Sequence, residues 1–178
     1  MKKILMGFSV FDLIIIALMA GLGLAMKPII VPLIHIITGP LYIPGGAVAG
    51  GFYMLWIVLA MGLVNKRGTC ALVALVQGIM VITIGSIGSH GIASLFTYSL
   101  PGIMAEIAFL FSKEKKYTIL HYMGGCVLAN LTGTFGSNIV FFNLPLIPLF
   151  VSLSTAALSG SLGGVIAYNI TNKFKKYI

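Results

Sequence analysis

Long runs of apolar residues are the feature that most restricts what this chain can form. A helix needs about 20 apolar residues to cross the hydrocarbon core of a bilayer, and such runs recur along the whole sequence. Only 8% of the residues are charged, against roughly a quarter in soluble domains. We therefore expect an all-α membrane protein, and the length of 178 residues predicts one integral membrane domain over residues 1–178.

Six of the apolar runs are long enough to form spans. They lie at about residues 8–26, 46–64, 68–86, 92–111, 118–141 and 146–171. The first run is too long for the apolar region of a cleavable signal peptide, so we expect it to remain as a span. A seventh apolar stretch, residues 28–46, contains Pro28, Pro32, Pro40 and Pro44. Because proline removes a backbone donor and breaks helix geometry, we predict a kinked, re-entrant or surface-lying outer segment between helices 1 and 2.

The basic residues decide between six and seven spans. All but one of the eleven Lys and Arg residues fall into four clusters, which are Lys2–Lys3, Lys66–Arg67, Lys113/Lys115/Lys116 and Lys173/Lys175/Lys176. Six spans put every cluster on one side and leave only Lys27 elsewhere. Since cytoplasmic loops carry an excess of Lys and Arg, we predict six transmembrane helices with both termini in the cytoplasm. This asymmetry accounts for the net charge of +8 without a nucleic-acid partner.

Glu106 is the acid that most needs an explanation, because it stands inside the apolar stretch GIMAEIAFLF. Ionisable residues within spans are rare and commonly functional. Two interpretations stay open. The carboxyl group is either a buried structural group, hydrogen-bonded to a neighbour such as Gln77 or Asn130, or it faces a cavity and binds an amine, a hydroxyl or a cationic ring.

Other polar and aromatic residues gather toward the outer ends of the spans. Tyr53 and Trp56 stand three apart and share one helical face, although Tyr and Trp near an interface are commonly membrane anchors. His90, in the turn GSIGSHG, is either a substrate-binding residue or an ordinary loop residue. Aromatic faces, amides and one acid suit a small, flat, polar-edged molecule. The predicted substrate-binding residues are Glu106, Gln77, Tyr53, Trp56, His90, Tyr98, Asn130 and Asn138.

Small residues recur every fourth position in the first span, at Ala17, Gly21 and Ala25. Helices associate in lipid by close packing of such residues. This ridge is therefore either an internal packing seam or a docking face for a second membrane subunit.

Sequence patterns that would indicate an enzyme or a metal site are missing. The chain has no Walker A sequence, no HExxH and no GxSxG, and its two cysteines, Cys70 and Cys126, lack the spacing of a redox or metal motif. We therefore expect no enzymatic activity, no cofactor and no bound metal.

Three local features resemble the S components of energy-coupling factor (ECF) transporters, the substrate-binding membrane subunits of vitamin importers of the ABC type. They are the Ala17–Gly21–Ala25 ridge, the segment GPLYIPGGAVAGG after the first span, and NKRGTCALVA at the start of the third. The resemblance implies a protein of the bacterial plasma membrane that docks through the ridge on a coupling transmembrane subunit carrying two cytoplasmic ATPases. It further implies that the proline-containing segment covers the pocket and that the loaded subunit topples in the membrane.

The residues VQG at 76–78 and MAEIAF at 104–109 are most similar to S components for thiamine or its hydroxymethylpyrimidine precursor. The resemblance thus implies a small vitamin-like substrate. An alternative is a stand-alone, proton-coupled secondary transporter that uses Glu106 as its titrating carboxylate. A structural membrane subunit without a ligand is a further alternative.

Overall fold

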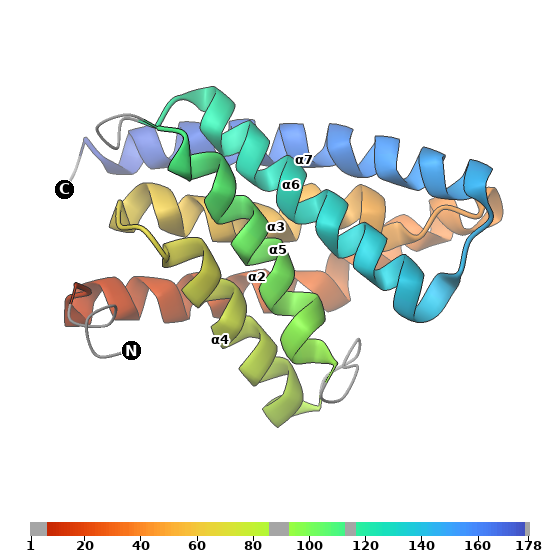
Figure 1. Ribbon diagram of the computed structural model, residues 1–178, viewed down its shortest axis with the longest axis horizontal. Helices are drawn as coiled ribbons and strands as arrows, with labels where there is room; N and C mark the ends of the chain where they lie inside the picture. Colours follow the sequence, from red (N-terminus) through yellow and green to blue (C-terminus); the bar gives the residue numbers. More distant parts are fainter. Residues whose placement is uncertain (1–6, 86–92, 113–116, 177–178) are drawn as a thin grey trace.

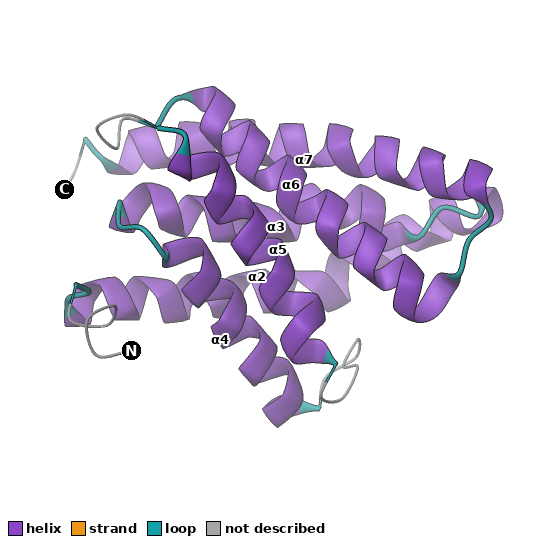
Figure 2. Ribbon diagram, in the orientation of Figure 1, coloured by secondary structure: helices purple, strands orange, loops and turns teal. Residues whose placement is uncertain are grey.

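The computed structural model describes residues 7–85, 93–112 and 117–176, and this part of the chain is built from helices joined by short loops (Figures 1 and 2). Six long helices follow one another along the described residues. They are α2 (Val10–Thr38), α3 (Gly45–Val64), α4 (Thr69–Ile84), α5 (Ser94–Leu110), α6 (Ile119–Ser137) and α7 (Leu146–Phe174). A 3-10 turn, η1 (Gly39–Leu41), follows α2, and a π-helical turn, η3 (Asn138–Phe142), follows α6.

The order of six helices agrees with the prediction from the apolar runs. Within the described residues, four segments are long and apolar enough to cross a membrane, namely Val10–Leu41, Gly45–Val64, Ile119–Phe142 and Leu146–Phe174. The helices α4 and α5 are also apolar but have only 16 and 17 residues. A crossing by all six helices, and the cytoplasmic position of the termini, therefore remain predictions.

The proline-rich segment differs from its prediction. The helix α2 continues through Pro28 and Pro32 as far as Thr38, so the expectation of a break near residue 26 is wrong. Proline is tolerated inside membrane helices because neighbouring groups and small local adjustments satisfy the freed carbonyls. The irregular connection to α3 is confined to residues 39–44.

The helix α3 forms the centre of the bundle. Fourteen of its 20 residues are buried, and in Figure 1 it lies between α2 and α7, behind α5. Glycines allow α7 to approach it closely, because a Cβ atom on Gly163 would overlap the backbone of Gly51. Close packing of α3 against α7 thus depends on glycine at this contact.

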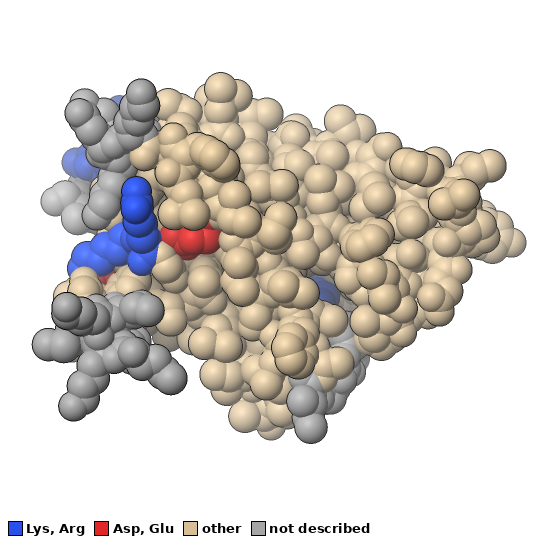
Figure 3. Space-filling model, in the orientation of Figure 1, with Lys and Arg blue, Asp and Glu red and all other residues tan. Residues whose placement is uncertain are grey.

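Charged side chains gather at one end of the molecule. Figure 3 shows most of the visible charged side chains together at one end, whereas the rest of the visible described surface is almost free of charge. Lys66, in the connection from α3 to α4, forms an ion pair with Asp12 near the start of α2. Lys173 lies in the last turn of α7 at this same end. We refer to this end of the molecule, with Lys66 and Lys173, as the basic end.

Candidate functional site

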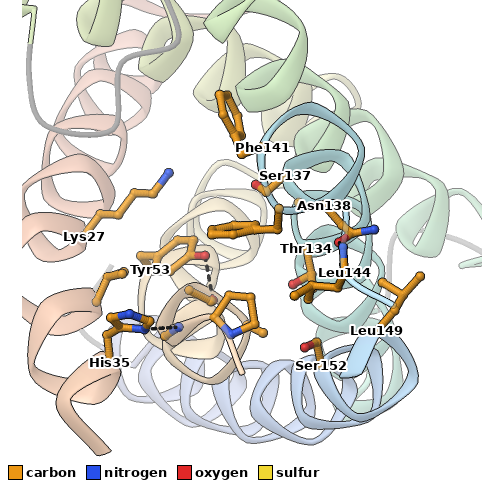
Figure 4. A pocket seen from close by; sticks show the side chains of 17 residues that line it. Lys27, His35, Tyr53, Thr134, Ser137, Asn138, Phe141, Leu144, Leu149 and Ser152 are labelled. Atoms are coloured by element: carbon orange, nitrogen blue, oxygen red, sulfur yellow. Dashed lines mark hydrogen bonds between the residues drawn. The ribbon is translucent and has the colours of Figure 1, made fainter. Parts of the chain in front are cut away.

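A cavity of about 300 Å³ lies at the end of the bundle opposite the basic end (Figure 4). Its walls come from the later part of α2, the start of α3, the ends of α6 and η3, and the start of α7. Both α3 and α7 begin at this cavity and end near basic residues, which places the two features far apart. The volume is in the range found for sites that bind small molecules.

Lys27 supplies a positive charge to one wall of this cavity. Its Nζ atom donates a hydrogen bond to the hydroxyl oxygen of Tyr98 at 2.7 Å. The same atom lies 4.2 Å from the centroid of the Tyr98 ring and 5.6 Å from that of Tyr53. Aromatic faces attract a cation at such distances, so the two tyrosines hold the ammonium group beside the cavity.

Hydroxyl groups line the opposite wall. Figure 4 shows Thr134 on α6 and Ser152 on α7 facing the cavity, across from Lys27 on α2. The Ser152 side chain is fully buried, and its Oγ atom has no hydrogen-bond partner among the described residues. Since buried polar groups are nearly always hydrogen-bonded, this hydroxyl on the cavity wall is a candidate contact for a bound molecule.

The π-helical turn η3 shapes the end of the cavity beside α6. A π turn is rare and frequently occurs at functional sites. Asn138, its first residue, accepts a hydrogen bond from the backbone N–H of Leu144 at 2.9 Å through Oδ1, which fixes the connection to α7. Phe141 and Phe142 from the same turn line the cavity and add an apolar, aromatic surface.

The connection between α2 and α3 forms part of the rim. The backbone N–H of Gly45 donates to Nδ1 of the exposed His35 at 3.3 Å, and the Tyr53 hydroxyl donates to the carbonyl oxygen of Gly46 at 2.9 Å. These bonds tie the start of α3 to the wall of the cavity. A lid function of this connection remains a prediction.

Four of the residues predicted to bind a substrate lie at this site. Tyr53 and Asn138 line the cavity, and Tyr98 and Gln77 line an adjoining small pocket that shares Lys27 with it. Gln77 also donates a hydrogen bond to the carbonyl oxygen of Ala20 at 3.3 Å.

The other predicted residues lie elsewhere. The Nδ2 atom of the fully buried Asn130 donates to the carbonyl oxygens of Ala47 and Ala156, at 3.0 and 2.8 Å, and so joins α6 to α3 and α7. Trp56 packs against the hydrophobic core. His90 falls outside the described residues.

Glu106 does not line the cavity or the adjoining pocket. Its two carboxylate oxygens accept hydrogen bonds from the backbone N–H groups of Gly68, at 2.7 Å, and Cys70, at 2.9 Å. These amides belong to the N-terminus of α4, which lacks a side-chain cap of its own. Exposed amides and the helix dipole both favour a negative charge there. Glu106 on α5 thus caps the N-terminus of α4, next to Lys66 and Arg67 in the connection from α3 to α4. The sequence had predicted that Glu106 lies in the pocket or forms a hydrogen bond with a neighbour such as Gln77 or Asn130.

Lys27 and Ser152 were missing from the predicted site. A signal for Lys27 existed, because it is the one basic residue outside the four clusters. No comparable signal marks Ser152, which stands among many other hydroxyl residues of α7.

The small-residue ridge of α2 faces away from the bundle. Ala17 and Ala25 are exposed, and a Cβ atom on Gly21 would meet nothing nearer than the Met80 Cε atom at 4.0 Å. The ridge is therefore not an internal packing seam in this structure. Docking of a second subunit on it remains a prediction.

Comparisons with known proteins agree with a transport function. A family model described as "ABC-type cobalt transport system, permease component" matches residues 11–132. A solved structure described as "Crystal structure of an S-component of ECF transporter" matches with a TM-score of 0.73 at 16% sequence identity, covering 94% of this chain and 85% of that chain. No curated protein matches the chain. At this identity the structural match shows a shared fold.

Proposed function

The chain belongs to the family of permease components of ABC-type cobalt transport systems, and on this premise we propose that it is an S component, the substrate-binding membrane subunit of an ECF importer. The observation that carries the proposal is the cavity of about 300 Å³, lined by Lys27, aromatic rings and hydroxyl groups, in a bundle with the S-component fold. An apolar cavity with a few polar groups that point into it is typical of a site for a small molecule.

The proposal assigns a direction to the bundle. The basic end faces the cytoplasm of a bacterial cell, since basic loops are retained on that side, and the cavity then faces outward. A molecule enters from outside and is held between α2, α3, α6 and α7. The Ala17–Gly21–Ala25 ridge, exposed at both alanines, docks on a coupling transmembrane subunit, and two cytoplasmic ATPases on that subunit drive release inward.

The lining of the cavity favours an organic substrate over a free metal ion. Within the described residues no three His, Cys, Asp or Glu side chains form a group that could hold a metal. The described lining contains His35 but no carboxylate, and it contains the ammonium group of Lys27, which repels cations. Divalent transition metals are held mainly by imidazole, thiolate and carboxylate ligands, and of these the described lining contains one imidazole, that of His35.

Among organic molecules, thiamine and its hydroxymethylpyrimidine precursor are the substrates we favour. Both carry a flat aminopyrimidine ring, which can stack on aromatic side chains such as those of η3 and form hydrogen bonds with hydroxyl groups such as those of Thr134 and Ser152. Thiamine also carries a positive charge, which the ammonium group of Lys27 opposes. The neutral pyrimidine is therefore the better candidate of the two.

Proton-coupled transport through Glu106 has no specific observation in its favour. The carboxylate is bound by two backbone amides at the basic end. Within the part of the chain that the structure describes, it does not line the cavity or the adjoining pocket.

Native mass spectrometry of the detergent-purified chain tests ligand capture, and uptake in cells tests the energy source. We expect an added mass that matches a small heterocycle, and uptake that requires the ATPase subunits. A chain that stays bare after addition of thiamine and hydroxymethylpyrimidine contradicts the proposed capture. Uptake that proceeds without any ATPase and collapses with a protonophore indicates a secondary transporter instead.

A further inference from the structure

We propose that Lys27 sets the charge selectivity of the cavity, which therefore takes a neutral or anionic molecule with a hydrogen-bond acceptor directed at the ammonium group. This inference rests on the proposed function, because it names the chemical class that the captured substrate must have. It starts from the position of Lys27, which lies in the middle of the apolar stretch Val10–Leu41 and away from the basic end.

The charge of Lys27 has no counter-charge among the described residues. Asp12 is paired with Lys66, and Glu106 is bound to the amides at the start of α4. A charged group placed within a membrane span is costly and is retained where it pairs with a partner or faces a functional cavity. The partner of Lys27 is therefore to be sought in the cavity that it lines.

The ammonium group also keeps unused hydrogen-bonding capacity. It carries three N–H donors, and the hydrogen bond to Tyr98 uses one of them. The aromatic faces of Tyr53 and Tyr98 attract the cation. They do not replace the hydrogen bonds that an anion or a carbonyl oxygen would accept from the other two N–H groups. A hydrogen-bond acceptor on a bound molecule would use one of these remaining N–H donors of Lys27.

Ser152 supplies a second, separate point of recognition. Its buried hydroxyl faces the cavity from α7, opposite Lys27, and lacks a partner among the described residues. Phe142, Leu144 and Leu149 add apolar lining to the same cavity. The molecule that fits has a flat apolar body, an acceptor at the Lys27 end and a hydrogen-bonding group at the Ser152 end.

The test compares three probes that share one ring system and differ in charge. Neutral hydroxymethylpyrimidine, its anionic phosphate ester and cationic thiamine are titrated into the full chain in detergent, and the molecule that co-purifies with the chain is identified by mass spectrometry. The variants are Lys27→Met and Lys27→Arg. Lys173→Met is the matched control, because it removes an exposed lysine at the basic end.

We expect a neutral or anionic molecule to bind best, and Lys27→Met to weaken its binding roughly tenfold or more, as expected for a charge-assisted hydrogen bond. Lys27→Arg retains most of the affinity, and Lys173→Met retains all of it. Should Lys27→Met fail to fold, the order of affinities of the three probes for the wild-type chain decides the question.

Two results overturn the inference and are distinguishable from each other. If thiamine or another cation binds best, or if folded Lys27→Met binds with unchanged affinity, Lys27 does not set selectivity and ligand capture still stands. If the wild-type chain binds neither a co-purified molecule nor any probe, the proposed function fails together with this inference.

Discussion

The carboxylate of Glu106 on α5 accepts a hydrogen bond from the backbone amide of Gly68, 38 positions earlier in the chain. The same side chain holds the amide of Cys70. One acid therefore connects α4 and α5 at the basic end, remote from the cavity. Its position within an apolar run is explained by the backbone amides at the start of α4, which need an acceptor.

Replacing Glu106 by alanine tests this capping role. The amides of Gly68 and Cys70 lose their acceptor, so we expect the free energy of unfolding to fall by about 1–2 kcal/mol, as for the loss of an N-cap. The affinity for the ligand stays unchanged. Thermal unfolding in detergent and ligand titration measure the two effects. If Glu106→Ala instead loses affinity for the ligand while its stability is unchanged, Glu106 takes part in ligand binding and the capping role is wrong.

Gly21 and Gly163 form a contrasting pair for the docking surface. A Cβ atom at Gly21 comes no nearer than 4.0 Å to another group, the flexible end of Met80, whereas one at Gly163 overlaps the backbone of Gly51. We expect Gly21→Leu to fold and bind ligand normally but to lose uptake, because the bulky group blocks close helix contact with a coupling subunit. Gly163→Leu should fail to fold. Normal uptake by Gly21→Leu, measured in cells with the complete transporter, contradicts docking at the ridge.

Removal of the Ser152 hydroxyl separates recognition from stability. Because its Oγ atom has no partner among the described residues, Ser152→Ala should leave the melting temperature equal or slightly raised. Ligand affinity should fall by roughly three- to tenfold, the value of one ordinary hydrogen bond. Ser154→Ala, which alters an exposed serine bonded to the Phe150 carbonyl, is the control. Equal affinities of the two variants exclude a role for Ser152 in binding.

Asn130 was predicted to bind the substrate, and its bonds to Ala47 and Ala156 indicate a different outcome of mutation. Asn130→Ala removes the side-chain donor from two buried carbonyls, breaks the hydrogen bonds that join three helices and opens a small void, so we expect a loss of about 2–4 kcal/mol in the free energy of unfolding. Protein that remains folded keeps its ligand affinity. Stability is followed by thermal unfolding, and a stable variant that no longer binds argues for direct contact with the ligand.

The helix order could be predicted from the sequence because apolar runs of membrane length leave few other structures. The path through Pro28 and Pro32 could not, since proline breaks an isolated helix but is accommodated within a membrane bundle. The prediction therefore ended the first helix too early.

The site was predicted only in part, for a physical reason that Glu106 and Lys27 illustrate. The partners of Glu106 are backbone amides, which every residue but proline carries, so no sequence pattern marks them. Tyr53 and Tyr98 could be suspected of recognition, but their meeting with Lys27 depends on how three separate helices pack. Distance along the chain gives no measure of that proximity.

The unequal lengths of the helices bear on how the bundle sits in a bilayer. The helix α2 has 29 residues and α4 has 16, a difference of about 20 Å at 1.5 Å per residue. A hydrocarbon slab about 30 Å thick cannot match both in one upright pose. The longer α2 is accommodated by tilting and the shorter α4 by thinning of the lipid beside it, and each costs a fraction of a kcal/mol per Å of mismatch. Where both helices cross the membrane, the thickness of the surrounding bilayer therefore affects the tilt of α2 and the thinning of lipid beside α4 in opposite directions.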